Sequence, residues 1–422
     1  MKNFTLDEWI QWQCKLHSTN MDFNLSRIKI VAARLNIEKT KSKVFTVAGT
    51  NGKGSTVAIL ESILTESGYS VGSYTSPHLL EFNERIKVNK VPSSTKEICN
   101  AFEIIEKSRK DITLTYFEFS TLAAFIIFSQ KKLDVLILEV GLGGRLDAVN
   151  IIDSDVSIIT NIGLDHTSIL GNDMNKIALE KSGVMRRNKP TIIGYSEIHN
   201  SIIKYSKEIG SNLSIINKHF FNKVNEDKKW VFTNIDGIEI ECEPPGIKGD
   251  IQINNAATAI QAIHSCDGIN LNEINLQNGL KKSEILGRFQ VLNTSPETIL
   301  DIAHNEQSII LLINNLKKYY PKKKFHAVFS VLKDKNIDEM LNLLKGIFDS
   351  WHIAQSNNDR ALEVTELKEK KFFILEKPIV YDSIELAYEG ALKKSNKKED
   401  VLVVFGSSYT VAPILKKNIK NE

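Results

Sequence analysis

The chain alternates short apolar runs with longer stretches of helical periodicity. Residues Val44–Ala48 form a β-rich run that ends at Gly49, and a helical stretch follows over Ser55–Ser67, closed by Gly68. Asp134–Val140 is a continuous apolar run with one acid near its end, the pattern of a buried parallel strand. Two further runs have the same character, Val156–Thr160 and Thr191–Gly194, and between them Asn172 or Asp173 can cap a helix that runs to about Arg187. Strands that alternate with helices predict a parallel α/β sheet.

The pattern changes after this series. Residues 218–243 alternate and carry turn signals, which predicts antiparallel hairpins at the edge of the sheet, and Pro244-Pro245-Gly246 closes them. A helix over about Asn254–Ser265 follows. A second series of strands and helices begins after Gly287, with candidate strands at Thr298–Ala303, Phe325–Val331, Trp351–Gln355 and Asp400–Phe405.

We therefore predict an α/β fold of two domains, residues 1–287 and 288–422. The first should be a parallel sheet with helices on both faces and a small antiparallel edge sheet. The second should be a smaller, Rossmann-like α/β domain.

Composition narrows the class of protein. The 54 Lys and Arg against 51 Asp and Glu leave a net charge of +3, so we expect no broad nucleic-acid partner. The longest apolar runs, such as Leu122–Phe128, are far shorter than the roughly 18 residues of a membrane span, and we expect no membrane partner. No apolar signal segment is visible near the N-terminus, and the four scattered cysteines favour neither disulfides nor a zinc site. These features predict a cytoplasmic enzyme.

The first candidate site is the glycine-rich segment Gly49-Thr50-Asn51-Gly52-Lys53-Gly54-Ser55-Thr56, between a predicted strand and a predicted helix. Backbone N–H groups and a helix N-terminus at such a junction favour an anion. Lys53 could reach the β- and γ-phosphates of a nucleotide, and Ser55 or Thr56 could face a metal. The general phosphate-loop pattern requires Ser or Thr directly after the Lys, where Gly54 stands here. An ordinary glycine-rich turn therefore stays open as the alternative.

A second glycine cluster, Gly141-Leu142-Gly143-Gly144-Arg145-Leu146, follows the strand that ends near Glu139. A dinucleotide fingerprint would need glycine at Leu146, so nicotinamide binding is disfavoured, and a tight turn explains the glycines equally well. A carboxylate at the end of a parallel strand lies where open α/β sheets bind ligands, which makes Glu139 a candidate. Its alternative is a structural ion pair with Arg145.

Taken in order, several segments resemble the Mur ligase superfamily and, within it, the dihydrofolate synthase/folylpolyglutamate synthase family. The phosphate loop with glycine after the lysine is that family's own form. The resemblance runs nearly end to end and rests on Thr46–Ser55, Ser73–Leu79, Leu138–Asp147, Leu164–Thr167, Glu180–Gly183, Asn255–Thr258, Gly287–Phe289 and Asp301–Asn305.

The resemblance implies a P-loop ATPase-like first domain and an ATP-dependent amide ligase that works through an acyl phosphate and L-glutamate. It implies ATP as co-substrate, Mg²⁺ and a monovalent cation, with phosphates held by Asn51, Gly52, Lys53, Gly54 and Ser55. The matching magnesium ligands are Ser76, Glu139 and His166, and Lys181 matches a lysine that the family carries N-carboxylated. Asn255, Arg288 and Asp301 match ATP-contacting positions, and His304 and Ser407 match positions linked to glutamate. Without the resemblance, His166 would be a loop residue, Lys181 solvated surface, Asp301 a helix cap and Ser407 the end of a strand.

The resemblance also implies a dihydropteroate site. Its segments are Asp22-Phe23, Thr115-Tyr116-Phe117-Glu118 and Leu146-Asp147-Ala148, and Arg85 is a candidate for a substrate carboxylate. A flat pterin needs an apolar wall and a few polar anchors, which Phe117, Thr115 and Asp147 could supply. The aromatic cluster could equally be core.

Three alternatives remain at the level of sequence. Peptidoglycan ligases carry a further N-terminal domain, for which the residues before Gly49 are too few, so we expect a folate enzyme. Within that family we favour the bifunctional enzyme, acting on dihydropteroate and reduced folates, over a folylpolyglutamate synthase alone. The third alternative is a nucleotide-binding protein without catalytic activity. We expect a monomer with small-molecule partners.

Overall fold

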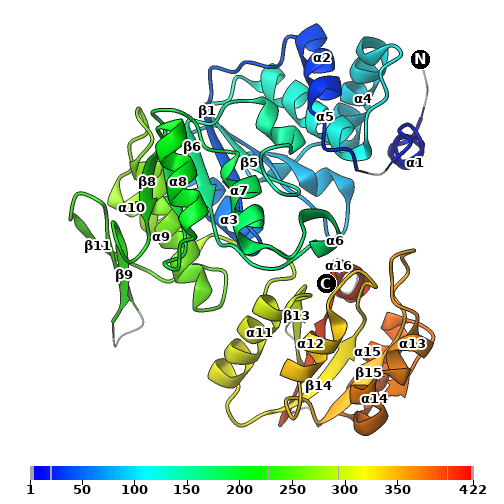
Figure 1. The fold of residues 1–422 in the computed structure, drawn as a ribbon. Helices are drawn as coiled ribbons and strands as arrows, with labels where there is room; N and C mark the ends of the chain where they lie inside the picture. Colours follow the sequence, from blue (N-terminus) through cyan, green and yellow to red (C-terminus); the bar gives the residue numbers. More distant parts are fainter. Residues whose placement is uncertain (1–3, 20, 226–228, 293, 397, 420–422) are drawn as a thin grey trace. The chain divides into compact units, whose positions relative to one another are not determined.

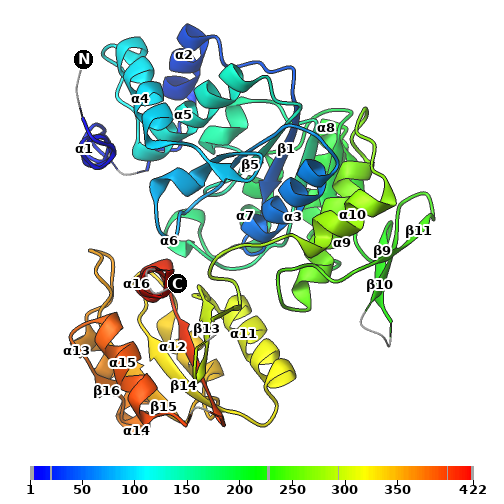
Figure 2. The same ribbon diagram turned by 180° about the vertical axis from the view of Figure 1, so that it is seen from behind.

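The structure is a computed structural model and describes residues 4–19, 21–225, 229–292, 294–396 and 398–419. These pack into two units (Figures 1 and 2). The first comprises the described residues through Leu164 together with Leu170–Gly246 and Gln252–Glu284, and the second comprises Asp165–Ile169, Ile247–Ile251 and the described residues from Ile285 onward. No helix among the described residues combines the length and apolar character that a membrane crossing requires.

The first unit is built on an eight-stranded sheet with the order β4-β3-β2-β5-β1-β6-β7-β8. The strands from β2 to β8 in this order run parallel, whereas β3 and β4 join antiparallel. Their bounds are β1 (Lys43–Ala48), β2 (Val71–Tyr74), β3 (Ile86–Val88), β4 (Val91–Pro92), β5 (Val135–Glu139), β6 (Val156–Ile159), β7 (Pro190–Ile193) and β8 (Asn212–Ile215). The parallel sheet predicted from the apolar runs is confirmed.

Helices cover both faces of this sheet because its strands are apolar on both sides. Leu136 and Leu138 of β5 pack into the core cluster that contains the N-terminal helices, and Figure 2 shows α3, α9 and α10 over the other face. The helices are α1 (Leu6–Gln13), α2 (Ser26–Leu35), α3 (Lys53–Glu66), α4 (Thr95–Arg109), α5 (Tyr116–Lys131), α7 (Met174–Ser182), α8 (Asn200–Ile209), α9 (Ile251–His264) and α10 (Glu273–Lys281), with 3₁₀ turns η1 (Phe82–Arg85) and η2 (Ala148–Ile151). The short helix α6 (Thr167–Leu170) falls mostly within the second unit.

Three predicted helix bounds are wrong, and one of them is the start of α9, which begins at Ile251 rather than near Asn254. The helix after the glycine loop begins at Lys53 rather than Ser55, because Gly52 (φ +83°) takes the left-handed conformation at its N-cap. The helix capped by Asp173 ends at Ser182 rather than near Arg187, with Gly183 at its C-cap. A Cβ on Gly183 would lie 2.2 Å from the Cβ of Arg145, so this close approach requires glycine.

The predicted hairpins form a three-stranded antiparallel sheet of their own, in the order β11-β10-β9. Its strands are β9 (Phe221–Val224), β10 (Trp230–Thr233) and β11 (Glu239–Cys242). The Trp230 indole donates a hydrogen bond to the carbonyl of Glu243, 3.0 Å away, which holds the following segment against the sheet.

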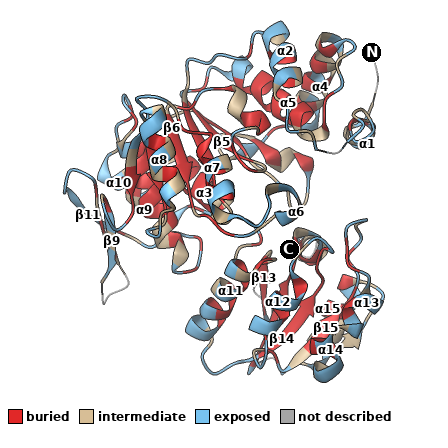
Figure 3. Cartoon of the chain, viewed as in Figure 1, coloured by how far each residue is buried: buried red, intermediate tan, exposed pale blue. Residues whose placement is uncertain are grey.

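The second unit contains a six-stranded sheet in the order β12-β13-β17-β14-β15-β16. All pairs are parallel except β12 with β13. The strands are β12 (Gln290–Leu292), β13 (Glu297–Asp301), β14 (Lys324–Phe329), β15 (Ser350–Ile353), β16 (Ile379–Val380) and β17 (Asp400–Phe405). The helices are α11 (Glu306–Tyr319), α12 (Ile337–Leu343), α13 (Val364–Glu369), α14 (Lys371–Glu376), α15 (Ile384–Lys394) and α16 (Ser408–Ile419). Each unit has its own buried core, drawn in red in Figure 3.

Candidate active site

The glycine-rich loop joins the end of β1 to the start of α3. Gly49 has φ +146°, and a Cβ there would lie 1.9 Å from Oγ1 of Thr160, so only glycine fits. The Lys53 ammonium lies over the loop and donates to the carbonyls of Gly49 (3.1 Å) and Thr50 (3.2 Å). The hydroxyl of Thr56 donates to the carbonyl of Gly52 within the helix, which leaves Ser55 as the better candidate to face a metal.

A second segment, which the sequence analysis did not select, holds this loop in place. The Asn161 carboxamide oxygen accepts hydrogen bonds from the backbone N–H groups of Thr50 (3.2 Å) and Asn51 (2.8 Å). The Thr160 hydroxyl donates to the carbonyl of Asn51, 2.6 Å away. Both residues directly follow β6, next to β1, and polar residues at the end of a predicted parallel strand were a signal that could have identified them.

Two other predicted residues lie against the same loop. Asn255 in α9 places its carboxamide beside Gly52, since a Cβ on Gly52 would lie 3.0 Å from Asn255 Oδ1. Lys181 in α7 is only 5% exposed and donates from Nζ to the carbonyl of Gly49, 2.8 Å away. The solvated-surface alternative for Lys181 is therefore wrong.

Glu139 and Ser76 lie together at the ends of neighbouring strands. Glu139 ends β5 and is 5% exposed, and one of its carboxylate oxygens accepts from the backbone N–H of Ser76 at 3.1 Å. The register that pairs Val47 with Glu139 brings this carboxylate to the carboxyl ends of the strands, where the glycine loop also lies. The alternative ion pair with Arg145 is wrong, because Arg145 pairs with Glu180 at 2.6 Å.

Ser76 and Glu139 suit a hard divalent cation, which prefers oxygen ligands. Among the described residues, no three His, Cys, Asp or Glu side chains gather as a metal site would require, so a serine hydroxyl and water would have to complete the coordination. The third predicted ligand, His166, packs with the second unit. Its backbone takes φ +51°, and its N–H donates to the carboxylate of Asp165 at 2.8 Å.

The predicted dihydropteroate segments meet beside the second glycine cluster. The ring of Phe117 lies against Gly141, where a Cβ would be 2.6 Å from Phe117 Cζ, and its centroid is 5.9 Å from that of Tyr74. Leu146 precedes Asp147, which is 5% exposed and accepts from the backbone N–H groups of Leu142 (2.9 Å) and Val149 (3.0 Å). Burial raises the pKa of Asp147 to about 6 against the lowering effect of these hydrogen bonds. Ala148, also buried, follows in η2.

Thr115 and Glu118 form the capping box of α5, with the Glu118 N–H donating to Thr115 Oγ1 at 3.2 Å. Arg27, which the sequence analysis missed, joins two of the predicted segments, because it pairs with Glu118 at 3.1 Å and with Asp22 at 2.6 Å. Neighbouring Phe23 is 38% exposed.

Arg85 is buried beneath the same helix end. Its guanidinium carbon lies 5.3 Å from the ring centre of Tyr116, and its Nε donates to Nδ1 of His78 at 2.8 Å. Burial and the nearby Arg85 charge lower the pKa of His78 to about 4, so this imidazole is neutral and can accept that hydrogen bond at physiological pH.

In the second unit, Asp301 ends β13 and holds the backbone rather than capping a helix. Its carboxylate accepts from the N–H groups of Phe289 (2.9 Å) and Ala303 (2.8 Å), and burial raises its pKa although the Arg288 charge opposes this. Asn305 is the residue that caps the next helix, α11.

His304 follows, and both of its ring nitrogens lie near oxygen acceptors. Its Nδ1 must donate to the carbonyl of Ile302, 2.7 Å away, and its Nε2 lies 3.5 Å from the carboxylate of Asp165. Lys335 also pairs with Asp165, at 2.7 Å. Burial opposes ionisation of Asp165, but the His304 hydrogen bond and the Lys335 charge hold its pKa well below the usual range.

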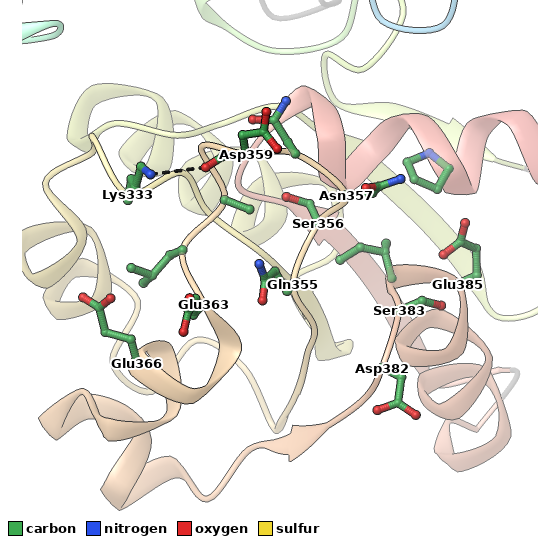
Figure 4. A pocket seen from close by; sticks show the side chains of 15 residues that line it. Lys333, Gln355, Ser356, Asn357, Asp359, Glu363, Glu366, Asp382, Ser383 and Glu385 are labelled. Carbon is green, nitrogen blue, oxygen red and sulfur yellow. Dashed lines mark hydrogen bonds between the residues drawn. The ribbon is translucent and has the colours of Figure 1, made fainter.

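A cavity of about 650 Å³ in the second unit lies beyond the ends of β15 and β16 (Figure 4). Its lining is rich in carboxylates, contributed by Asp359, Glu363, Glu366, Asp382 and Glu385. Lys333 is the one Lys or Arg among the lining residues (Figure 4), so carboxylates dominate the charge of this cavity. Ser407 is not among the lining residues, and its hydroxyl accepts from the Thr410 N–H at 3.1 Å at the start of α16.

Comparisons with known proteins agree with this architecture. Residues 47–295 match the family model of the Mur ligase middle domain, and residues 287–408 match that of the Mur ligase glutamate ligase domain. A dihydrofolate synthase/folylpolyglutamate synthase of Buchnera aphidicola subsp. Schizaphis graminum is 38% identical over 421 residues, covering 98% of this chain and 97% of the relative.

Solved structures match over nearly the full length. E. coli FolC in complex with DHPP and ADP has a TM-score of 0.93 and 37% identity, covering 99% of both chains. A bifunctional folylpolyglutamate synthase/dihydrofolate synthase with Mn, AMPPNP and L-glutamate bound has a TM-score of 0.91 and 38% identity, covering 99% of this chain and 98% of the other. The chain therefore belongs to the Mur ligase family and, within it, to the dihydrofolate synthase/folylpolyglutamate synthase family of ATP-dependent C–N ligases.

Proposed function

We propose that the chain joins L-glutamate to 7,8-dihydropteroate, giving dihydrofolate, and also extends reduced folates by further glutamates. The observation that carries the proposal is the contact of Phe117 with Gly141, two residues after Glu139. This contact puts the segment matched to dihydropteroate binding beside the strand end that faces the glycine loop. A pterin seated against Phe117 would then direct its benzoate carboxylate towards a nucleotide on that loop.

In the proposed reaction, the carboxylate oxygen attacks the γ-phosphorus of ATP, and ADP leaves. The amino group of glutamate then attacks the acyl carbon, and phosphate leaves with the bonding electrons. Such chemistry needs aligned donors and cations more than a covalent nucleophile. The backbone of Asn51–Ser55 would hold the phosphates, with Asn255 beside Gly52.

The Lys53 ammonium would leave its loop carbonyls to neutralise charge on the transferring phosphoryl group. Mg²⁺, held by Ser76 and Glu139 with His166 as a third ligand, would supply further neutralisation. A monovalent cation could assist.

We also propose that Lys181 functions as its N-carboxylated form. Addition of CO₂ to the deprotonated amine gives a carbamate and releases a proton, which turns a buried cation into a buried anion. The side chain is 5% exposed and reaches the loop backbone, so the carbamate oxygens would lie where a metal could be bound.

Residues 288–422 would complete the nucleotide site through Arg288 and Asp301, and they would handle glutamate through His304 and Ser407. His304 would help to position glutamate, because the hydrogen bond from its Nδ1 to the carbonyl of Ile302 fixes the orientation of the ring. Of the residues matched to the dihydropteroate site, Thr115, Tyr116, Glu118, Asp22 and Leu146 would shape the pocket, and Arg85 would stiffen it through Tyr116.

The test is product identification by mass spectrometry with ATP, L-glutamate and either dihydropteroate or tetrahydrofolate. We expect one added glutamate on each acceptor. Phe117→Ala should impair the dihydropteroate reaction more than the folate reaction, whereas Phe221→Ala, at an exposed position of β9, should impair neither. If the protein extends tetrahydrofolate but makes no dihydrofolate, it is a folylpolyglutamate synthase alone.

A further inference from the structure

The first unit contains a cavity of about 630 Å³ that the proposed reaction does not use. Its lining includes Lys43 and Val135, the first residues of β1 and β5. The cavity therefore opens at the amino ends of the parallel strands, whereas Gly49 follows the carboxyl end of β1 and Glu139 is the last residue of β5. At about 3.3 Å per residue, the six residues of β1 separate the two edges by about 20 Å.

The floor of this cavity is apolar and consists of buried side chains. Phe125 and Phe128 of α5, Leu133 and Ile152 line it, and each is below 8% exposed. Phe128 and Leu133 are fixed by β2, because a Cβ on Gly72 would lie 2.6 Å from Leu133 Cδ1 and 2.9 Å from Phe128 Cδ1. Water against such a floor makes few hydrogen bonds, so an apolar group that displaces it is favoured.

The rim carries positive charge from two separate segments. Lys39 and Lys41 lie on the chain leading into β1, Lys43 is the first residue of that strand, and Lys132 is the C-cap of α5. Lys43 also faces Asp155, whose carboxylate pairs with Lys189 at 2.8 Å, so the rim charge rests mainly on Lys39, Lys41 and Lys132. The lining has one acid, Asp134, and its carboxylate accepts from the N–H (2.8 Å) and hydroxyl (2.6 Å) of Ser70.

We propose that this lysine-rimmed cavity (Lys39, Lys41, Lys43 and Lys132 around the floor of Phe125, Phe128, Leu133 and Ile152) binds a small organic acid. The ligand has a flat apolar body and at least two anionic groups. An apolar body is needed to displace water from the apolar side chains of the floor, which inorganic phosphate would not do. Because the lysines lie on two separate segments, a ligand with two anionic groups is favoured over one with a single anionic group, since each anionic group can lie near a different segment.

The proposal is tested by calorimetric titration with 4-aminobenzoyl-L-glutamate, which has one aromatic ring and two carboxylates. Because this probe also resembles parts of the substrates, the titration uses protein saturated with dihydropteroate and AMPPNP. The uncharged dicarboxamide of the same probe measures the contribution of the two charges.

The variant Lys41→Glu/Lys132→Glu reverses two exposed rim charges without touching the core. Its matched control, Lys218→Glu/Lys223→Glu, makes the same change of net charge at exposed positions around β9. We expect the rim variant to bind the probe at least tenfold more weakly and the control within twofold of the parent, with ligation unchanged in both. The dicarboxamide should bind at least tenfold more weakly than the diacid.

Several results would overturn the proposal. These are no heat of binding at millimolar probe, equal binding by rim and control variants, or equal binding of the dicarboxamide. Loss of binding when the active site is saturated would assign the probe to that site instead. Full displacement by an equal concentration of inorganic phosphate would mean that charge alone recruits anions there, without use of the apolar floor.

Discussion

Gly141→Ala should impair use of dihydropteroate through a single contact. The backbone of Gly141 is ordinary, so alanine is allowed there, but its Cβ would lie 2.6 Å from Cζ and 2.9 Å from Cε2 of Phe117. Carbon atoms pack at about 3.5–4.0 Å, so the ring must retreat by about 1 Å. Overpacking of this kind costs about 1–3 kcal/mol. If that cost falls on the productive complex, kcat/KM for dihydropteroate drops about 5- to 150-fold.

The measurement is steady-state phosphate release with dihydropteroate and with tetrahydrofolate, and circular dichroism checks the fold. The control combines Gly141→Ala with Phe117→Ala, because the second substitution removes the ring that the new methyl group would meet. In the Phe117→Ala background, Gly141→Ala should lower kcat/KM for dihydropteroate less than twofold further, because both substitutions act on the same contact. Unaltered kinetics in the single variant, or equal losses in both backgrounds, would refute the role assigned to Phe117 as the wall.

Three further expectations concern charge. Lys53→Ala should lower ligation by about a thousandfold or more with the fold intact, since a cation at the transferring phosphoryl group is lost; activity within tenfold of the parent would contradict the loop assignment. Lys181→Ala should be inactive and partly rescued by added acetate or formate, and absence of a carbamate carbon signal in ¹³CO₂-labelled protein would argue against carboxylation. Because the pKa of Asp147 is raised to about 6, its carboxylate ionises between pH 5 and 7, and KM for dihydropteroate should fall over that range as it becomes a better acceptor for pterin N–H groups. Asp147→Asn should lose this inflection, and a profile shared by both proteins would assign it to another group.

The sequence predicted the elements whose signal is local. The run Val44–Ala48 and the acid at the end of Asp134–Val140 identified β1 and β5, because central parallel strands are apolar on both faces. The short β2, Val71–Tyr74, was missed, since its glycine and serine break the apolar run and its parallel partner β5 is more than sixty positions away. Strands of two or three residues, such as β4 and β16, have no pattern of their own and exist through their partners.

Contacts between distant segments could not be read from spacing. The place of Asn161 after β6 was a usable signal, but nothing local indicates that Arg27 joins Asp22 to Glu118, or that Arg145 pairs with Glu180 rather than with Glu139. The glycine requirement at Gly141 likewise comes from a ring 24 positions earlier, not from backbone conformation. Motifs in order were sufficient to identify the family, but the roles of individual residues depend on these distant contacts.

The register of β1 with its two neighbours decides where this chain can be lengthened. Val47 pairs with Glu139 on one side and with Ile158 on the other, so one residue inserted within β5 would turn the Glu139 carboxylate to the opposite face of the sheet. The turn at Gly237, between β10 and β11, belongs to the separate antiparallel sheet, and a Cβ on Gly237 would meet no heavy atom within 4 Å. A reporter peptide or an affinity tag spliced in after Gly237 would therefore leave ligation intact, whereas the same tag spliced into β5 would destroy it.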